Sequence, residues 1–293
     1  MIRNLMLLAA GLFLAACQQH SAPAVNQPPP APLLYEIANA DGGVEGWLFG
    51  TIHALPDGVE WRTDALAAAN AKADMLIVEI AALDDSAALS RIYTRLARSP
   101  NLPPLTSRVS EANRAKLDML IARSSFNASD FDAVETWAAS LMLAQLAKTG
   151  DNKNGVDRAM IKLFEGRKLR EFEGAEAQLS IFDQLPEADQ RDLLDGVIED
   201  IERAENDPAE LRNAWLAGDE DALIEATQTG IMADPELREA LLVQRNRDWI
   251  KQLETILPRE ERPMIAVGAG HLVGPDGMPA MLEQAGYSIR PLQ

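Results

Sequence analysis

Two apolar runs that end in the same four-residue pattern constrain the fold of this chain most strongly. Trp47 to His53 reads WLFGTIH and Met264 to His271 reads MIAVGAGH, so each run breaks at a Gly-x-x-His motif. An apolar run of this length is typical of a buried strand, and glycine lets the backbone leave the sheet edge while the imidazole projects over it. The pair predicts one sheet with His53 and His271 at a shared site. The alternative for either histidine alone is a buried or capping role.

The composition is that of a globular protein with ample core material. The chain has 293 residues, 47% of them hydrophobic, which is enough for one large domain or two modest ones. The formal net charge of -18 would repel a phosphate backbone, and no basic run offsets it, so we expect no nucleic-acid partner. The third histidine, His20, lies outside the expected globular part.

The first 17 residues resemble a bacterial lipoprotein signal. Arg3 supplies positive charge, and a short apolar segment leads to Leu14-Ala15-Ala16-Cys17, the pattern of a lipobox. Cleavage would leave Cys17 as the lipidated first residue, anchored by acyl chains. The alternative is an ordinary secretory signal with an incidental cysteine. Because Cys17 is the only cysteine, the mature domain cannot hold an internal disulfide.

Two features after the cysteine extend this interpretation. Gln18 follows Cys17, and a residue other than aspartate at this position resembles the pattern sorted to the outer membrane. Residues 18–32 are rich in Pro, Ala and Gln, which predicts an extended tether. We therefore expect a lipid-anchored protein of the bacterial cell envelope, on the outer membrane and facing the periplasm, with the lipid as its only membrane contact.

Residues 33–293 form the expected folded domain, and its first elements follow from local patterns. Leu33 to Ala38 and Val44 to His53 are strand-like, and Ala40-Asp41-Gly42-Gly43 between them predicts a β-hairpin. An alanine-rich helix is expected over residues 63–72. The first Gly-x-x-His motif therefore falls on a connection from strand to helix.

Glu79 stands near the carboxyl end of the next apolar strand, residues 74–80. Strand, helix and strand in this order predict a right-handed parallel crossover. His53 and Glu79 would then emerge at the carboxyl ends of neighbouring strands, where open α/β sheets bind their ligands. The alternative for Glu79 is a solvated strand end.

Most of the remaining chain is expected to be helical. Residues 84–150 and 175–257 carry apolar residues at three- and four-residue spacing, which predicts helices that pack against the sheet or cover it. Lys168 to Glu173, between them, reads as a short strand with Glu173 at its end, either as surface charge or as a site residue. Arg245 lies on the longest helical pattern and either pairs with nearby acids or faces the site.

The two ends of the domain repeat one design. After Met264 to His271 come a helix over residues 278–285 and a last strand over residues 287–292, as a helix and a strand follow His53. The expected fold is therefore α/β, a central mixed β-sheet built from two related half-units (strand, Gly-x-x-His, helix, strand) with a large helical insertion between them.

Several ordered motifs together resemble the TraB/GumN family. They are WLFGTIHALP, the strand ending in Glu79, GVD at Gly155 to Asp157, FEGAEAQL at Phe172 to Leu179, RN at Arg245-Asn246, and VGAGHLVGPDGMPAMLEQAGY. This family is grouped with the Tiki metalloproteases and, more distantly, with erythromycin esterases and haem-iron-binding lipoproteins. The resemblance implies an α/β domain whose two Gly-x-x-His histidines and a strand-end glutamate form one active site. Family members commonly have leucine where this chain has Phe172.

Two imidazoles and a carboxylate are the minimum set that binds a catalytic divalent ion and leaves a position open for water. The expected function is a metal-dependent, peptidase-like hydrolase with His53, His271 and Glu79 on the metal. Glu79 and Glu173 would share the roles of third ligand and general base, and Arg245 would stabilise the oxyanion. Ligand types allow zinc, and resemblance to Tiki suggests manganese or cobalt.

Two other functions are compatible with the same residues. One is a metal-independent, esterase-like hydrolase in which one histidine acts as the base. The other is a lipid-tethered protein that binds haem, iron or a peptide without turnover, with imidazole as the haem ligand. The expected partner is accordingly a peptide or a small-molecule substrate, and the sequence does not predict the oligomeric state.

Overall fold

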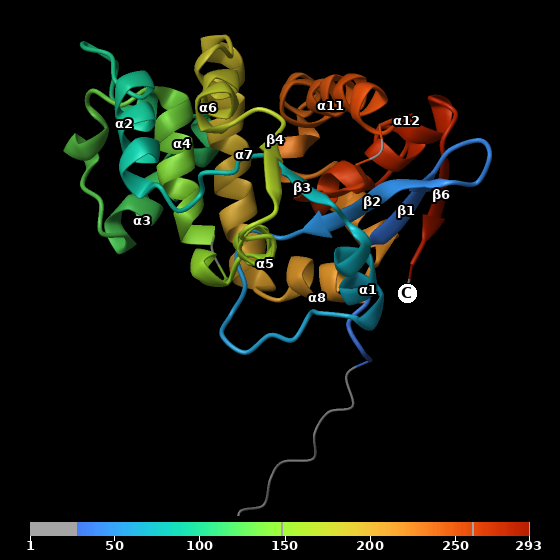
Figure 1. Cartoon of the computed structure of the whole chain (residues 1–293). Helices are drawn as coiled ribbons and strands as arrows, with labels where there is room; N and C mark the ends of the chain where they lie inside the picture. Colours follow the sequence, from blue (N-terminus) through green and yellow to red (C-terminus); the bar gives the residue numbers. More distant parts are fainter. Residues whose placement is uncertain (1–27, 148, 260, 293) are drawn as a thin grey trace, which may run out of the picture.

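The computed structural model describes residues 28–147, 149–259 and 261–292 (Figure 1). The expected signal, residues 1–17 with the lipidation site Cys17, lies outside the described residues, as does most of the tether. Ala31, at the end of the tether, already donates its N–H to Leu216 O. Within the described ranges no helix is both long and apolar enough to cross a membrane.

A six-stranded mixed sheet in the order β4-β3-β5-β2-β1-β6 forms the centre of the fold. The strands are β1 Leu34–Ala38, β2 Val44–Thr51, β3 Met75–Val78, β4 Lys168–Glu171, β5 Pro263–Gly268 and β6 Ser288–Pro291. β4, β3, β5 and β2 are parallel to one another, whereas β1 is antiparallel to both of its neighbours, β2 and β6. The expected α/β fold with a mixed sheet is confirmed.

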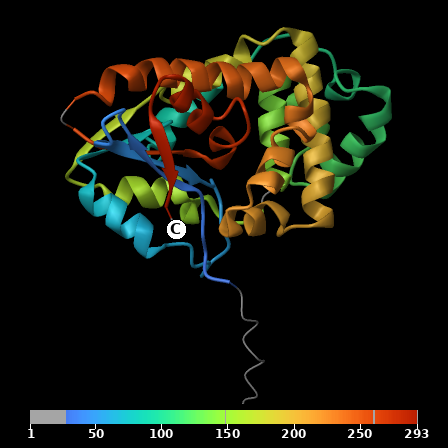
Figure 2. The ribbon, with the colours of Figure 1, turned by 90° about the vertical axis from the view of Figure 1, so that its right-hand side faces the viewer.

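Helices cover both faces of the sheet and form a separate lobe beside it. The helices are α1 Asp64–Lys72, α2 Ser86–Leu96, α3 Arg114–Arg123, α4 Thr136–Ala144, α5 Val156–Leu163, α6 Ala175–Asp183, α7 Glu187–Asn206, α8 Glu210–Ala217, α9 Glu220–Ala226, α10 Pro235–Arg238, α11 Gln244–Ile256 and α12 Met278–Gln284. α11 and α12 lie on one face of the sheet, and α1 and α5 lie on the other (Figures 1 and 2). α2, α3, α4, α6 and α7 make up the lobe, so the predicted helical insertion is confirmed.

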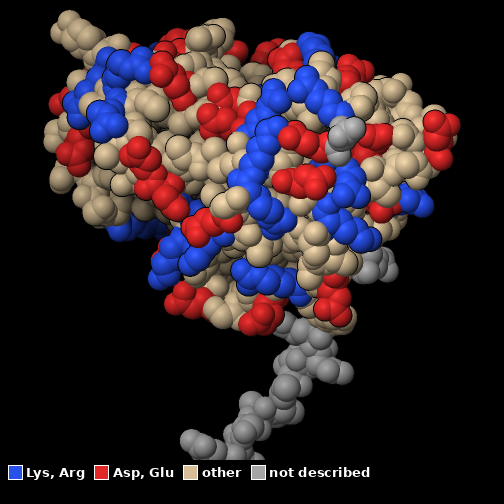
Figure 3. Space-filling view, viewed as in Figure 1, with Lys and Arg blue, Asp and Glu red and all other residues tan. Residues whose placement is uncertain are grey.

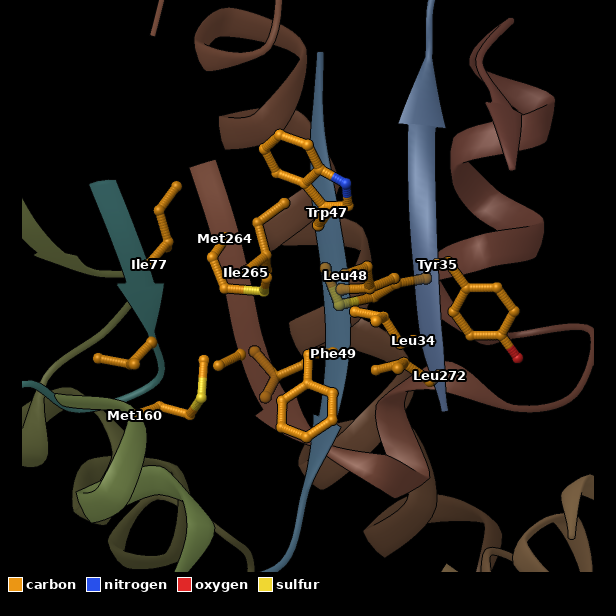
Figure 4. Close-up of a cluster of buried hydrophobic side chains, with 14 of the residues drawn as sticks. Leu34, Tyr35, Trp47, Leu48, Phe49, Ile77, Met160, Met264, Ile265 and Leu272 are labelled. Atoms are coloured by element: carbon orange, nitrogen blue, oxygen red, sulfur yellow. The ribbon is translucent and has the colours of Figure 1, made fainter. Parts of the chain in front are cut away.

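The sheet with its covering helices and the helical lobe each have a hydrophobic core of their own. The first is built on the sheet and includes Trp47, Leu48 and Phe49 of β2 with Met264 and Ile265 of β5 (Figure 4). Most residues of both strands are buried because helices cover both faces of the sheet, which explains their uninterrupted apolar runs. The second core lies inside the helical lobe, where α4 packs along α7.

The first hairpin forms as predicted, with one difference at its end. The Asn39 side chain accepts the N–H groups of Asp41 and Gly43, and Gly42 has a φ of 82°, a conformation that glycine adopts without strain. β2, however, ends at Thr51 and not at His53. His53 therefore lies in the connection beyond the strand.

The strand order differs from the expectation in one respect that matters for the site. β2 and β3 were expected to be neighbours, but β5 lies between them and pairs with both in parallel. The reason is the second half-unit, whose first strand inserts at the centre of the sheet. The two histidine-bearing strands, β2 and β5, are therefore neighbours, and β3 with Glu79 lies on the far side of β5.

Charged side chains of both signs share the surface around the edge strand β4. Figure 3 shows a band of Lys and Arg side chains on this face with Asp and Glu side chains within and beside it. Lys168 of β4 pairs with Glu261, and Arg262 pairs with Asp74. The positive charge of the band is thus compensated locally.

Candidate functional site

The carboxyl ends of the central parallel strands converge beside Gly268, the last residue of β5. A Cβ atom built on Gly268 would lie 3.4 Å from Glu79 Oε1, 3.7 Å from His271 Cδ2 and 4.0 Å from His53 Cε1. The absence of a side chain at this position leaves the space that the three side chains surround. The site predicted at this sheet edge is thus the place where the structure brings His53, Glu79 and His271 together.

The register of β2 and β5 makes the two Gly-x-x-His motifs unequal. Gly50 pairs with Val267, and Gly268 pairs with Thr51, so the motifs are displaced by one residue. Successive residues of a strand face opposite sides of a sheet, so the two glycines do as well. A Cβ on Gly50 would lie 3.2 Å from Ala269 Cα. Gly50 therefore permits backbone packing, whereas Gly268 opens the site.

Glu79 follows β3 directly and is buried, with both carboxylate oxygens engaged. Oε1 accepts the Gly268 N–H at 2.9 Å, and Oε2 accepts Arg245 Nη2 at 2.6 Å and Gln178 Nε2 at 3.0 Å. Burial alone would raise the pKa of Glu79, but the positive charge of Arg245 and the hydrogen bond from the Gly268 N–H outweigh burial and lower it. Glu79 is therefore ionised at neutral pH.

Arg245 of α11 lies between the two glutamates, and each of its five N–H groups has a partner. Nε and Nη2 donate to Glu173 at 3.0 Å, Nη2 also donates to Glu79, and Nη1 donates to Leu241 O at 3.0 Å. The remaining Nη1 hydrogen faces His271 Nε2 at 3.3 Å. The Arg245 side chain is only 10% exposed, so its guanidinium is an internal counter-ion for two largely buried carboxylates.

Glu173 lies two residues beyond the end of β4 and belongs to the same network. Besides Arg245, the indole Nε1 of Trp249 donates to Glu173 Oε1 at 3.0 Å. Phe172 stacks on Trp249, with the ring centroids 5.0 Å apart. The phenylalanine at this position therefore supports the indole that holds the carboxylate.

His271 is buried and neutral, with its tautomer fixed by its neighbours. Nδ1 lies 2.6 Å from Asn246 Oδ1, which only accepts, so Nδ1 carries the hydrogen and Nε2 is the acceptor that faces Arg245. Asn246 is oriented in turn because its Nδ2 donates to Asp276 O at 2.7 Å. Burial is the main cause that lowers the pKa of His271 to about 3, so the ring stays uncharged across the neutral range.

His53 is the accessible histidine of the pair, with 74% of its side chain exposed. Its Nδ1 lies 2.9 Å from Asp157 Oδ2, at the start of α5, and the Thr51 hydroxyl donates to the other Asp157 oxygen at 2.5 Å. The hydrogen bond to Asp157 is the main cause that raises the pKa of His53 to about 9. With Nδ1 committed, Nε2 has no hydrogen-bond partner among the described residues.

These side chains line one wall of a cavity of about 440 Å³ between the sheet edge and the helical lobe. His53, Glu79, Arg245 and His271 form the polar wall with Gln178 of α6. The opposite wall consists mainly of leucine, isoleucine, methionine and phenylalanine side chains from the helices. A cavity of this size with a few convergent polar groups is typical of a small-molecule site.

Four further residues of the site were not predicted from the sequence. Each of them orients one of the predicted site residues by a hydrogen bond. Asp157 and Asn246 fix the two histidines, Gln178 bonds Glu79, and Trp249 bonds Glu173. Three of them fall within motifs named above, GVD, RN and FEGAEAQL. The motifs therefore indicated that these segments belong to the site, but the hydrogen-bond partner of each residue is known only from the structure.

In this arrangement the expected metal ligands do not fit a divalent ion. Among the described residues no group of three or more His, Cys, Asp and Glu side chains has the geometry of a metal site. The reason is visible in the contacts, since Arg245 donates to Glu79 Oε2 and faces His271 Nε2. Glu79 Oε2 and His271 Nε2, which would bind the metal ion, already contact the positively charged guanidinium of Arg245.

Known proteins resemble this chain over most of its length. Two similar proteins, from two bacteria, are both described as the uncharacterized protein YbaP. The Shigella flexneri protein is 27% identical over 82% of this chain and 89% of its own length, and the Escherichia coli K12 protein is 28% identical over 72% and 77%. No solved structure matches the chain. The family model described as TraB/PrgY/gumN covers residues 33–291, and the chain therefore belongs to the TraB/PrgY/gumN family.

Proposed function

We propose that this protein hydrolyses an ester or amide bond with His53 as the general base. The observation that carries the proposal is the Thr51–Asp157–His53 chain, which holds Nδ1 and leaves Nε2 free at the mouth of the cavity. A histidine oriented by a buried carboxylate is the arrangement that activates a nucleophile in many hydrolases. The other predicted site residues have no comparably free basic atom.

The proposed reaction uses water as the nucleophile. Neutral His53 accepts a proton from water at Nε2, the resulting hydroxide attacks the carbonyl carbon, and the imidazolium then returns the proton to the leaving alcohol or amine. The products are a carboxylic acid, which ionises, and the alcohol or amine. Asp157 stabilises the imidazolium that forms in the first step.

Gln178 is the proposed donor to the carbonyl oxygen. It lines the cavity, and one of its amide hydrogens is used by Glu79, which leaves the second without a partner among the described residues. Arg245 was expected to stabilise the oxyanion, but all five of its N–H groups are occupied. We assign Arg245, Glu79 and Glu173 to positioning, because they fix Gln178 and His271 in the wall.

The test measures turnover of chromogenic esters and amides. His53→Gln should lower kcat by about 10²- to 10⁴-fold, the usual contribution of a general base. Asp157→Asn should lower kcat and also move the pH profile. Since Asp157 raises the pKa of His53, kcat/KM of the native chain should rise with pH up to about 9, and in the variant the rise should shift toward 6.5.

Asp57→Asn is the matched control, because Asp57 is an exposed carboxylate in the same connection as His53. It should change neither kcat nor the pH profile. Full activity of folded His53→Gln protein would rule out His53 as the base. Binding of substrates without turnover of any of them would favour the non-catalytic binding function over hydrolysis.

A metal-dependent hydrolase, with manganese, cobalt or zinc on His53, His271 and Glu79, is the second candidate. The observation in its favour is the space at Gly268 that these three side chains surround. Binding would require Arg245 to release Glu79 Oε2 and His271 Nε2. Elemental analysis of protein purified without chelators, together with activity after exhaustive chelation, decides between the candidates, since the His53 mechanism predicts retained activity.

We also propose that the mature chain is a lipoprotein of the bacterial cell envelope, modified at Cys17 and directed to the outer membrane. The support is the lipobox before Cys17 and Gln18 after it. The intact mass of the mature protein tests the proposal directly. A mass that corresponds to an unmodified Cys17, or to a different first residue, would contradict it.

A further inference from the structure

The wall of the cavity opposite the catalytic edge is apolar and incompletely packed. Leu141 of α4 and Ile181 and Phe182 of α6 line it, and so do Ile231 and Met232 in the turn before α10. All five side chains are only partly buried, although they lie between the sheet and the helical lobe. Apolar surface of this kind gains free energy when a ligand removes it from water.

This wall offers almost nothing to the backbone of a peptide. Among the described residues that line this wall, the polar side chains are Gln178, which also contacts Glu79, and Thr227. The Thr227 hydroxyl already donates to Ile224 O at 2.8 Å. A peptide backbone in this chamber would leave its N–H and C=O groups unpaired, at a cost of about 1–3 kcal/mol for each group, whereas an alkyl chain has no such groups.

The charges at the catalytic edge select against an anionic ligand. Glu79, Glu173 and Asp157 supply three negative charges against the two positive charges of Arg245 and protonated His53, and the Arg245 guanidinium has no N–H left for a ligand. A carboxylate product would be repelled from this edge, which favours its release.

We infer that the substrate is a neutral ester or amide whose acyl chain occupies this chamber while its carbonyl group lies at the His53 edge. The inference names the substrate class of the proposed hydrolase and rests on that function. At roughly 30 Å³ per non-hydrogen atom, the volume of a water molecule in the liquid, 440 Å³ holds about fifteen atoms. Medium-length acyl chains therefore fit.

Leu211 of α8 marks the far end of the chamber. Leu211 and Ala226 line both this cavity and a second one of about 370 Å³, and the Leu211 side chain is half exposed. The second cavity has charged residues at its walls, among them Asp200, Arg203 and Glu225. Leu211 thus separates an apolar chamber from a polar one and sets the length of chain that the chamber accepts.

The binding test uses straight-chain alkan-1-ols that displace the neutral dye Nile red from the full chain. Affinity should rise about fourfold with each methylene, the value for removing one CH₂ group from water, and should stop rising once the chamber is full. Leu211→Ala should extend the rise to longer alcohols, and Ile181→Trp should end it at shorter ones. Met119→Ala, a change at an exposed side chain outside the cavity, is the control.

Two results would overturn the inference. One is an affinity that does not depend on chain length, or a limit that neither Leu211→Ala nor Ile181→Trp moves. The other is binding of decanoate as tight as binding of decan-1-ol, which would contradict the selection against anions.

Turnover of p-nitrophenyl esters from acetate to laurate separates this inference from the proposed function. A kcat/KM that rises with acyl length and responds to Leu211→Ala supports both. Chain-dependent binding without hydrolysis of any ester leaves the ligand class standing and rejects the hydrolase. Hydrolysis with no dependence on acyl length rejects the ligand class and leaves the hydrolase standing.

Discussion

At the scale of single residues, Arg245 explains how this sheet edge holds two buried carboxylates. Glu79 and Glu173 are each about nine-tenths buried, and burying an ionised group without a partner is costly. The planar guanidinium bonds both at once and also faces His271. Arg245, which the sequence led us to expect as a stabiliser of an oxyanion, is thus the counter-ion of two carboxylates in the structure.

Removal of this cation should destabilise the fold. Arg245→Met leaves Glu79 and Glu173 buried without a counter-charge, and breaking such a network costs about 3–5 kcal/mol. The free energy of unfolding in urea measures the loss. Arg245→Lys is the matched variant, because it keeps the charge but has three donors in place of five, and it should lose less. Equal stability of Arg245→Met and the native chain would contradict the counter-ion role.

His271 should make the fold sensitive to mild acid. Its pKa is about 3 in the folded chain and about 6.5 in the unfolded chain, so between these values only the unfolded state binds the proton. The titration of His271 should therefore lower the free energy of unfolding by about 2 kcal/mol between pH 7 and pH 5, while the raised pKa of His53 acts in the opposite direction over the same range.

His271→Gln removes this titration, so the variant should not show this loss of stability between pH 7 and pH 5. Urea unfolding of both proteins at pH 7 and pH 5 measures the difference. The range stays above the ordinary pKa of the carboxyl groups, so their titration contributes little. Equal pH dependence in the two proteins would show that His271 is not held neutral by burial.

At the scale of elements, the approach of α5 to the His53 connection positions the proposed base. Val156 N–H donates to Ile52 O at 2.9 Å, which ties the start of α5 to the residue before His53. Gly155 makes this approach possible, because a Cβ there would lie 2.4 Å from His53 O. Asp157 reaches His53 only when the two segments lie this close.

Gly155→Ala should therefore separate Asp157 from His53 and lower activity without unfolding the sheet. We expect a loss of kcat comparable to that of Asp157→Asn, and a pH profile that moves in the same direction. Turnover at several pH values checks this, and near-UV circular dichroism checks the fold. Native kcat in Gly155→Ala would show that the site tolerates a wider spacing.

The elements themselves could be predicted from local sequence, but their order could not. The glycine turn predicted the hairpin, and Thr63, whose side chain accepts the Leu66 N–H, predicted the start of α1. The predicted bounds of these elements agree with the structure to within a few residues. The insertion of β5 between β2 and β3 depends on pairing across about 200 residues, and no local pattern encodes it. The His53–Asp157 bond joins residues 104 apart and was missed for the same reason.

At the scale of the whole molecule, the cavity lies at the junction of two cores. Trp215 and Leu223 belong to the core on the sheet, Leu193 and Leu241 belong to the core of the lobe, and all four line the cavity. Their helical patterns predicted burial, but which of them face a cavity follows only from how the lobe meets the sheet. The sequence therefore predicted the sheet edge where His53, Glu79 and His271 meet, but it did not predict the cavity beside it.

A ligand that fills the chamber should stabilise the molecule as a whole, because it contacts both cores and binds only when they are together. Decan-1-ol, which has no ester or amide bond to hydrolyse, should add about 2.7 kcal/mol at one hundred times its Kd, the value expected from mass action. At roughly 2–4 °C per kcal/mol for a domain of this size, Tm should rise by about 5–10 °C. Differential scanning calorimetry measures the shift, and Ile181→Trp, which occupies the chamber with its own side chain, should reduce it. A shift that is equal in both proteins would mean that decan-1-ol binds elsewhere, since only the chamber distinguishes the two proteins.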